Sequence, residues 1–146
     1  MPIEITQPEA DALLRLEKHY LDNDRFVFTG LGDALRIPLF SDDRQEEFML
    51  DLTRGRIAIT KNTLQNRARK TIVLVRIDLG GAPHRNPDGE EVPAPHIHLY
   101  SEGYGDKWAY PLPDHFTDAS SLRTTFDEFI RFCNIVTQPN IQWGLF

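Results

Sequence analysis

Near the start of the chain, apolar residues recur at the spacing of a helix. They stand at Ala10, Leu13, Leu14 and Leu16. Thr6 precedes Glu9 by three residues, which is the spacing of a capping box, and Pro8 falls in the first turn, where its missing N–H costs nothing. We therefore predict a first helix over residues 7–20.

From residue 25 onward, apolar and polar residues alternate instead, and this alternation predicts β-strands. The predicted strands cover residues 25–28, 35–40, 47–52, 56–60, 71–79, 96–100 and 107–110. The apolar run in 71–79 is nearly unbroken, as is typical of a central strand. Residues 84–95 contain a Pro-Asp-Gly sequence and are predicted to form a turn-rich loop.

A second helix is predicted near the end of the chain. Its apolar stripe consists of Leu122, Phe126, Phe129, Ile130 and Cys133. The order of elements predicts an α+β fold, in which an N-terminal helix is followed by an antiparallel meander of five to seven strands and a C-terminal helix packs on the sheet. No repeat or linker interrupts the 146 residues, so we expect one domain, 1–146.

Composition narrows the class of protein without naming a function. The lone Cys133 excludes a disulfide framework and a structural zinc site built on paired cysteines. No apolar run approaches the ~18 residues of a membrane span, and the first residues lack the basic and apolar regions of a secretory leader. We expect a soluble, cytoplasmic protein that does not bind a membrane.

The net charge of −6 conceals a basic segment in the middle of the chain. Residues 1–53 carry a balance of −7 and residues 77–146 a balance of −6, whereas residues 54–76 carry seven bases and no acid. Such a segment is expected of a surface that binds phosphates. The alternative is that these bases pair with the acid-rich flanks and bind no ligand.

Alternation also predicts which side chains share a face of the hairpin formed by 96–100 and 107–110. If residues 102–105 form the turn, Ile97 lies opposite Tyr110, and a core face carries Ile97, Leu99, Trp108 and Tyr110. The opposite, polar face carries His96, His98, Tyr100 and Lys107. A neighbouring central strand adds Arg76 and Asp78 to that face if the register holds.

This set of residue types suits cleavage of RNA without a metal, so RNA is the expected partner. His96 and His98 would transfer the protons, Lys107 and Arg76 would stabilise charge on the phosphorane, and Tyr100 would stack on a base. Flanking phosphates would be held by Arg67, Arg69, Lys70 and Arg85. No cofactor is expected on this hypothesis.

Three alternatives remain open. His84, His96 and His98 could ligate a catalytic zinc together with water, with an acid of the 84–95 loop as a further ligand. The protein could instead be a non-catalytic inhibitor that uses its acidic flanks to occupy a basic nucleic-acid channel on a protein partner. Finally, histidines on the solvated face of a hairpin often have no chemical role.

The runs HRNPDGEE and PHIHLYSEGYGDKWA, with DLTRGRIAITKNTLQNRARKTIVLVRIDLGG before them, resemble a family of small prokaryotic proteins known as a domain of unknown function. The resemblance covers nearly the whole chain and implies a free-standing domain, often carried on mobile DNA, with no assigned activity. That setting is similar to those of toxin–antitoxin and phage-conflict modules, so a cognate antitoxin is a possible partner. The helix–meander order also looks like the fold of small ribonucleases and messenger-RNA interferases, although those toxins are usually basic and this chain is acidic.

Overall fold

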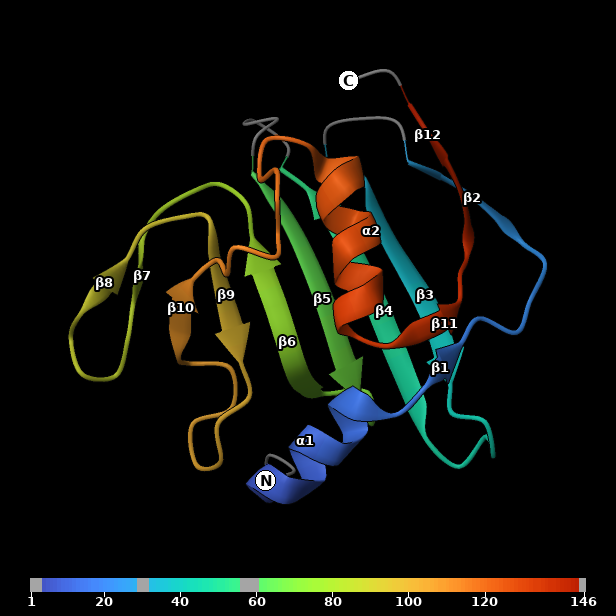
Figure 1. Ribbon diagram of the computed structural model, residues 1–146, viewed down its shortest axis with the longest axis horizontal. Coiled ribbons are helices and arrows are strands. Elements are labelled where there is room, and N and C mark those ends of the chain that lie inside the picture. Colours follow the sequence, from blue (N-terminus) through green and yellow to red (C-terminus); the bar gives the residue numbers. More distant parts are fainter. Residues whose placement is uncertain (1–3, 29–31, 56–60, 145–146) are drawn as a thin grey trace.

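An eight-stranded sheet forms the centre of the computed structural model, which describes residues 4–28, 32–55 and 61–144 (Figure 1). The two helices are α1 (Gln7–Arg15) and α2 (Leu122–Phe132). The strands are β1 (Lys18–His19), β2 (Arg25–Phe28), β3 (Ala34–Phe40), β4 (Glu47–Arg54), β5 (Asn62–Ala68), β6 (Ile72–Asp78), β7 (His84–Arg85), β8 (Glu91–Val92), β9 (His96–Leu99), β10 (Ala109–Pro111), β11 (Ile135–Thr137) and β12 (Asn140–Trp143). The predicted α+β class is confirmed.

The strand order of the sheet is β10-β9-β6-β5-β4-β3-β1-β11. Every neighbouring pair from β10 to β1 is antiparallel, and β1 pairs with β11 in parallel. Six strands therefore make the predicted meander, and the short β7–β8 hairpin is inserted between β6 and β9. A separate parallel pair joins β2 and β12.

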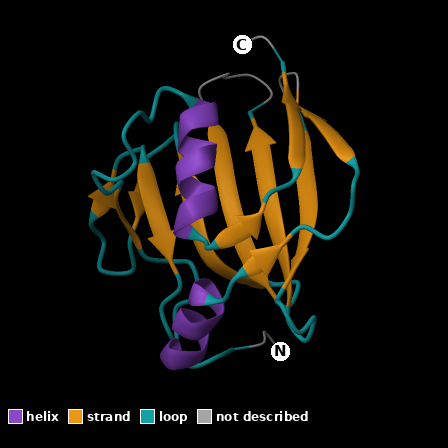
Figure 2. Ribbon diagram, turned by 45° about the vertical axis from the view of Figure 1, so that its right-hand side comes forward, coloured by secondary structure: helices purple, strands orange, loops and turns teal. Residues whose placement is uncertain are grey.

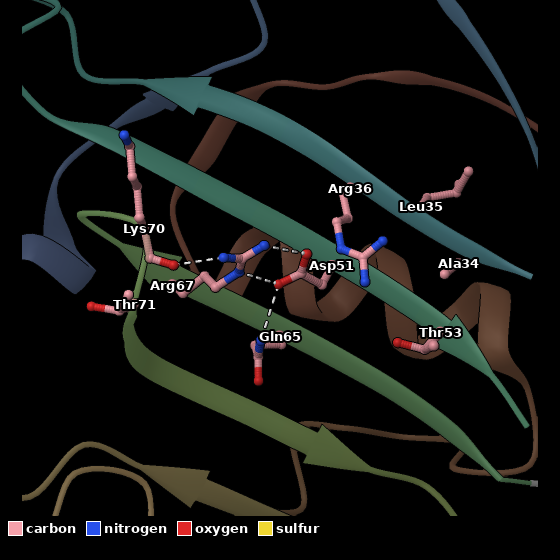
Figure 3. Close-up of a pocket in the computed structure, with 9 residues that line it drawn as sticks. All are labelled: Ala34, Leu35, Arg36, Asp51, Thr53, Gln65, Arg67, Lys70 and Thr71. Carbon is pink, nitrogen blue, oxygen red and sulfur yellow. Dashed lines mark hydrogen bonds and ion pairs between the residues drawn. The ribbon is translucent and has the colours of Figure 1, made fainter. Parts of the chain in front are cut away.

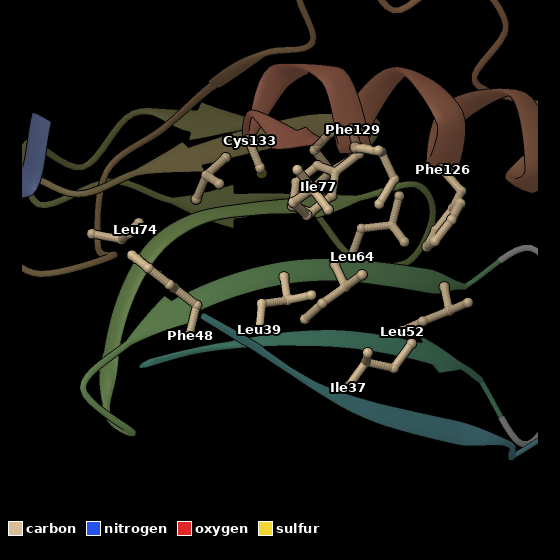
Figure 4. Packing of buried hydrophobic residues seen from close by; sticks show 14 of the residues in the cluster. Ile37, Leu39, Phe48, Leu52, Leu64, Leu74, Ile77, Phe126, Phe129 and Cys133 are labelled. Atoms are coloured by element: carbon tan, nitrogen blue, oxygen red, sulfur yellow. The ribbon is translucent and has the colours of Figure 1, made fainter. Parts of the chain in front are cut away.

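Helix α2 lies along one face of the sheet and covers its apolar side (Figures 1 and 2). All five residues of its predicted stripe are buried, with Phe129, Ile130 and Cys133 at zero exposure. They pack on sheet residues that include Leu52, Leu64 and Ile77 (Figure 4). Burying each large apolar side chain contributes roughly 1.5–3 kcal/mol, so this contact fixes which face of the sheet is the core.

Helix α1 begins as predicted and ends earlier. The Glu9 amide donates to the Thr6 hydroxyl, and the Glu9 carboxylate accepts from the Thr6 amide, which completes the capping box. The helix ends at Arg15, so the predicted span 7–20 is too long. The reason is Lys18, which is fully buried and starts β1 instead of continuing the helix.

The strand predicted at 56–60 lies outside the described residues. Strand β4 pairs with β5 (Asn62–Ala68), with Thr53 opposite Thr63. Strand β5 was not predicted because two of its four core-facing positions are Asn62 and Asn66, which weakens the apolar alternation. The Asn66 amide satisfies part of its hydrogen-bonding capacity by donating to the Met49 carbonyl at 3.3 Å.

The hairpin register is confirmed at Ile97, which pairs with Tyr110. The turn itself is one residue tighter than expected, because Ser101 bridges to Gly105 and not to Asp106. The predicted core position of Tyr110 is wrong: its exposure is 45%, because β10 is the edge strand of the sheet. The predicted solvated positions of His96 and His98 are also wrong, since both side chains are buried.

Candidate functional site

The face of the sheet opposite α2 is polar. Paired residues on neighbouring strands project to the same side, and the register joins one row across five strands. That row runs Arg36, Asp51, Gln65, Arg76 and His98. A second row places Asp78 opposite His96. The structure thus brings together four of the six residues that the alternation predicted to share a face: Arg76, Asp78, His96 and His98.

At one side of this face, two histidines share one carboxylate oxygen. His96 Nε2 lies 3.0 Å from Asp78 Oδ2, and His98 Nε2 lies 3.2 Å from the same atom. Both rings are buried, with exposures of 2% for His96 and 0% for His98. Macromolecular substrate therefore cannot contact these two rings directly in this conformation.

The guanidinium of Arg76 completes the charge network. Its Nη1 donates to Asp106 Oδ2 at 2.9 Å, and its Nε lies 3.4 Å from Asp78 Oδ1. Burial by itself would raise the pKa of Asp78. The hydrogen bonds from His98 and His96 and the positive charge of Arg76 outweigh that effect and hold the pKa well below its ordinary value of 3.8. Asp78 is therefore ionised at neutral pH.

The hydrogen bonds of His98 cannot all be satisfied at once. Its Nδ1 donates to the Asp106 carbonyl at 2.8 Å, so in a neutral ring Nε2 carries the lone pair. That lone pair accepts from Arg76 Nη2 at 3.0 Å but also faces the Asp78 carboxylate. Protonating Nε2 would satisfy Asp78 and set two donors, Nε2 and Nη2, against each other. Either protonation state leaves one unfavourable contact.

His84, on the inserted hairpin, is the cluster's solvent-accessible histidine. Its ring packs edge-on against His98, with centroids 4.5 Å apart, and lies 6.1 Å from the ring of His96. Its Nε2 donates to the Lys107 carbonyl at 2.6 Å, which leaves the lone pair on Nδ1. From the sequence, His84 was predicted only as a zinc ligand. The turn signal at Pro87-Asp88-Gly89 could have indicated that the chain folds back and returns His84 to β9.

Two other residues of the predicted catalytic set lie differently from expectation. The Tyr100 hydroxyl donates to the Ile5 carbonyl at 2.6 Å and accepts from the Ile5 amide, so it ties down the N-terminal segment. Lys107 reaches the cluster through its backbone carbonyl, and its side chain is exposed. A stacking role for Tyr100 thus has no support in the geometry.

Most of the predicted phosphate-binding arginines have acidic partners. Arg67 pairs with Asp51 at 2.7 Å, Arg69 with Glu46 at 2.7 Å, and Arg85 with Glu91 at 3.3 Å. These contacts favour the alternative in which the basic segment pairs with its acidic flanks. Lys70 differs, because its ammonium has no hydrogen bond or ion pair with another residue in the part of the chain that is described.

The same cluster offers ligand atoms to a metal ion. One atom each from Asp78, His96 and His98 lies within 4.8 Å of the others. The carbonyl bonded to His98 Nδ1 is the outer partner that a ligating histidine needs, whereas His96 Nδ1 is buried without a hydrogen-bond partner among the residues that the structure describes. The Arg76 guanidinium would also stand next to the cation. The residues therefore fit a zinc ion only in part.

Fold and site together define an α+β protein with one helix-covered face and one polar face that carries histidines. The chain belongs to a family of unknown function, DUF6978, whose model matches residues 5–135. No curated protein and no solved structure matches the chain. Within the described residues, neither helix is long and apolar enough to cross a membrane.

Proposed function

We propose that this protein is a metal-independent endoribonuclease that works on the polar face of its sheet, in the manner of a toxin from a conflict module. The observation that supports this proposal most is the hydrogen bonding of the His84 ring. A half-buried histidine with Nε2–H held by a carbonyl presents the lone pair of Nδ1, close to the half-buried Arg76 network and to an exposed lysine. An imidazole nitrogen with a free lone pair can act as the general base of such a reaction.

The proposed reaction assigns a step to each group. His84 Nδ1 takes the proton of the ribose 2′-hydroxyl, and the 2′-oxygen attacks the adjacent phosphorus. The bond to the 5′-oxygen breaks, which leaves a 2′,3′-cyclic phosphate, and the leaving oxygen takes a proton from the Lys107 ammonium. Arg76 stabilises the charge on the phosphorane. His96 and His98 become positioning residues, because their burial keeps them from the substrate and their contacts orient Asp78 and Arg76.

The first test compares His84→Asn with His115→Asn on a panel of fluorescent single-stranded RNAs. His115 is an exposed histidine that stacks on Phe132, so it is a matched control. We expect His84→Asn to lower the cleavage rate by about 10²–10⁴-fold, the usual contribution of a general base, and His115→Asn to leave it unchanged. The same sequences made of DNA should stay intact because they lack the 2′-hydroxyl. Equal cleavage by the two variants, or no cleavage by the parent, would contradict the proposal.

The role of metal is tested separately, since Asp78, His96 and His98 supply the ligand atoms of the zinc alternative. We expect cleavage by the parent protein to survive dialysis against a chelator, and added zinc not to raise the rate. Metal content is measured on the same samples, with His96→Gln as the comparison. Stoichiometric zinc that is lost in His96→Gln, together with activity that follows the zinc, would replace the metal-independent mechanism with a zinc hydrolase.

A further inference from the structure

A hollow of about 550 Å³ lies on the same polar face, over β3, β4 and β5. Figure 3 shows Asp51 and Arg67 in its centre, Arg36 on one side of them and Lys70 on the other. The hollow is separate from the histidine cluster and from the core beneath α2. Its lining is largely polar, so we consider which ligand it could bind.

The charges in the hollow do not cancel. Arg67 and Asp51 neutralise each other through contacts of 2.7 Å and 3.2 Å, and Arg67 also donates to the Lys70 carbonyl at 2.6 Å. These hydrogen bonds hold the Arg67 side chain in place, so Arg67 lines the hollow but offers no unpaired positive charge to a ligand. Arg36 and Lys70 are both exposed, and neither side chain pairs with an acid among the residues that the structure describes. The hollow therefore presents two unneutralised positive charges to an anion.

Register places this charge in line with the proposed catalytic cluster. Arg36 on β3 and His98 on β9 end one row of directly paired residues, separated by four strand-to-strand steps. At about 4.8 Å a step, the two ends are roughly 19 Å apart along an open face of the sheet. A ligand that contacts Arg36 and also reaches His84, whose ring packs on His98, must be an extended polyanion.

We propose that Arg36 and Lys70 form a phosphate-binding subsite for single-stranded RNA that runs across the sheet from His84. This inference rests on the proposed ribonuclease function and adds to it the form of the substrate, an unpaired strand several nucleotides long. The subsite contributes binding and not chemistry, since it lies away from the reacting phosphate. It also differs from the phosphate contacts predicted from the basic segment, because Arg36 comes from the acidic N-terminal part of the chain.

The test measures binding of a non-cleavable strand, so that it does not depend on catalysis. Fluorescence anisotropy gives the Kd of two labelled 2′-O-methyl RNAs, an octanucleotide (the octamer) and a dinucleotide. It is measured for three proteins: the parent, Arg36→Ala/Lys70→Ala, and Arg123→Ala/Arg131→Ala. The last variant loses the same charge from exposed positions of α2, which covers the opposite face. We expect only Arg36→Ala/Lys70→Ala to weaken octamer binding, by about 10-fold or more. Its log–log salt slope should also fall by about 0.7 for each lost phosphate contact.

The RNA dinucleotide and inorganic phosphate distinguish a strand-binding subsite from simple attraction between charges. The dinucleotide is too short to span the polar face of the sheet, so all three proteins should bind it equally. Equal weakening of octamer binding by the two variants would show a non-specific charge effect and overturn the subsite. So would competition by inorganic phosphate that is as effective as competition by the unlabelled octamer. Loss of cleavage in His84→Asn with no change in octamer binding for Arg36→Ala/Lys70→Ala would refute the subsite and leave the ribonuclease proposal standing.

Discussion

At the scale of single residues, Asp78 organises the candidate site. One of its oxygens lies within hydrogen-bonding distance of Nε2 of both His96 and His98, and the other lies near Arg76 and accepts from the Thr63 hydroxyl at 3.2 Å. Four partners on three strands thus meet at one side chain. A carboxylate with these partners stays ionised and fixes their positions. A substitution of Asp78 is therefore expected to affect both the stability of the protein and the geometry of the candidate site.

Asp78→Asn is therefore expected to lower the free energy of unfolding by about 2–3 kcal/mol at pH 7, since Arg76 and both histidines lose a charged acceptor. The folded-state pKa of Asp78 lies below its ordinary value of 3.8, so its contribution is fully present above that value and is lost as the pH falls below it. Urea unfolding at pH 7 and at pH 3 measures both effects. The stability difference between the parent and Asp78→Asn should be smaller at pH 3 than at pH 7, because the unfolded-state carboxyl is then mostly protonated, while Asp114→Asn, at an exposed position, should match the parent throughout. A difference as large at pH 3 as at pH 7 would contradict the assignment.

At the scale of elements, Lys18 joins the ends of both helices. Its ammonium donates to the carbonyls of Leu14, Leu16 and Cys133, at 2.8, 2.9 and 2.7 Å. Leu14 lies in the last turn of α1, Leu16 is its C-cap residue, and Cys133 caps α2. Burial lowers the pKa of Lys18 to about 8, so the side chain is still mostly charged at neutral pH. One buried cation thus satisfies acceptors that the two helix ends leave open.

Lys18→Met keeps the length of the side chain and removes all three donors. We expect it to lower the free energy of unfolding by roughly 3–5 kcal/mol, because buried carbonyls are left without partners. Thermal and urea unfolding at pH 7 provide the measurement, with Lys61→Met at an exposed position as the control. Equal stability of the two variants would show that Lys18 does not join the helix ends as described.

Elements were predictable from local pattern only where that pattern is strong. The stripe of α2 has a clear apolar period, and the apolar run of β6 is nearly unbroken. Strand β6 lies within one residue of its predicted bounds, and α2 carries the predicted stripe, with Cys133 as its C-cap. Strand β5 buries asparagines and was missed, and α1 was predicted too long because Lys18 is polar yet buried. In each failure a polar side chain finds its partners inside the fold, which a sequence period cannot reveal.

At the scale of the whole molecule, the two faces of the sheet differ in kind. Helix α2 covers one face (Figure 2), and the other face carries the basic hollow (Figure 3) and the histidine cluster. With a net charge of −6, the molecule as a whole repels a polyanion, so attraction must come from this face alone. For this reason the binding test compares two variants that lose the same charge from opposite faces of the sheet.

Periodicity along the chain was enough for the fold class, for the second helix, for the hairpin register and for the grouping of His96, His98, Arg76 and Asp78 on one face. These features depend on neighbours in sequence or on alternation, and both can be read locally. The burial of the two histidines, the return of His84 to them and the pairing of Arg67 with Asp51 came only from the folded chain. They depend on how the inserted hairpin and adjacent strands pack in three dimensions, and burial and charge pairing are properties of that packing.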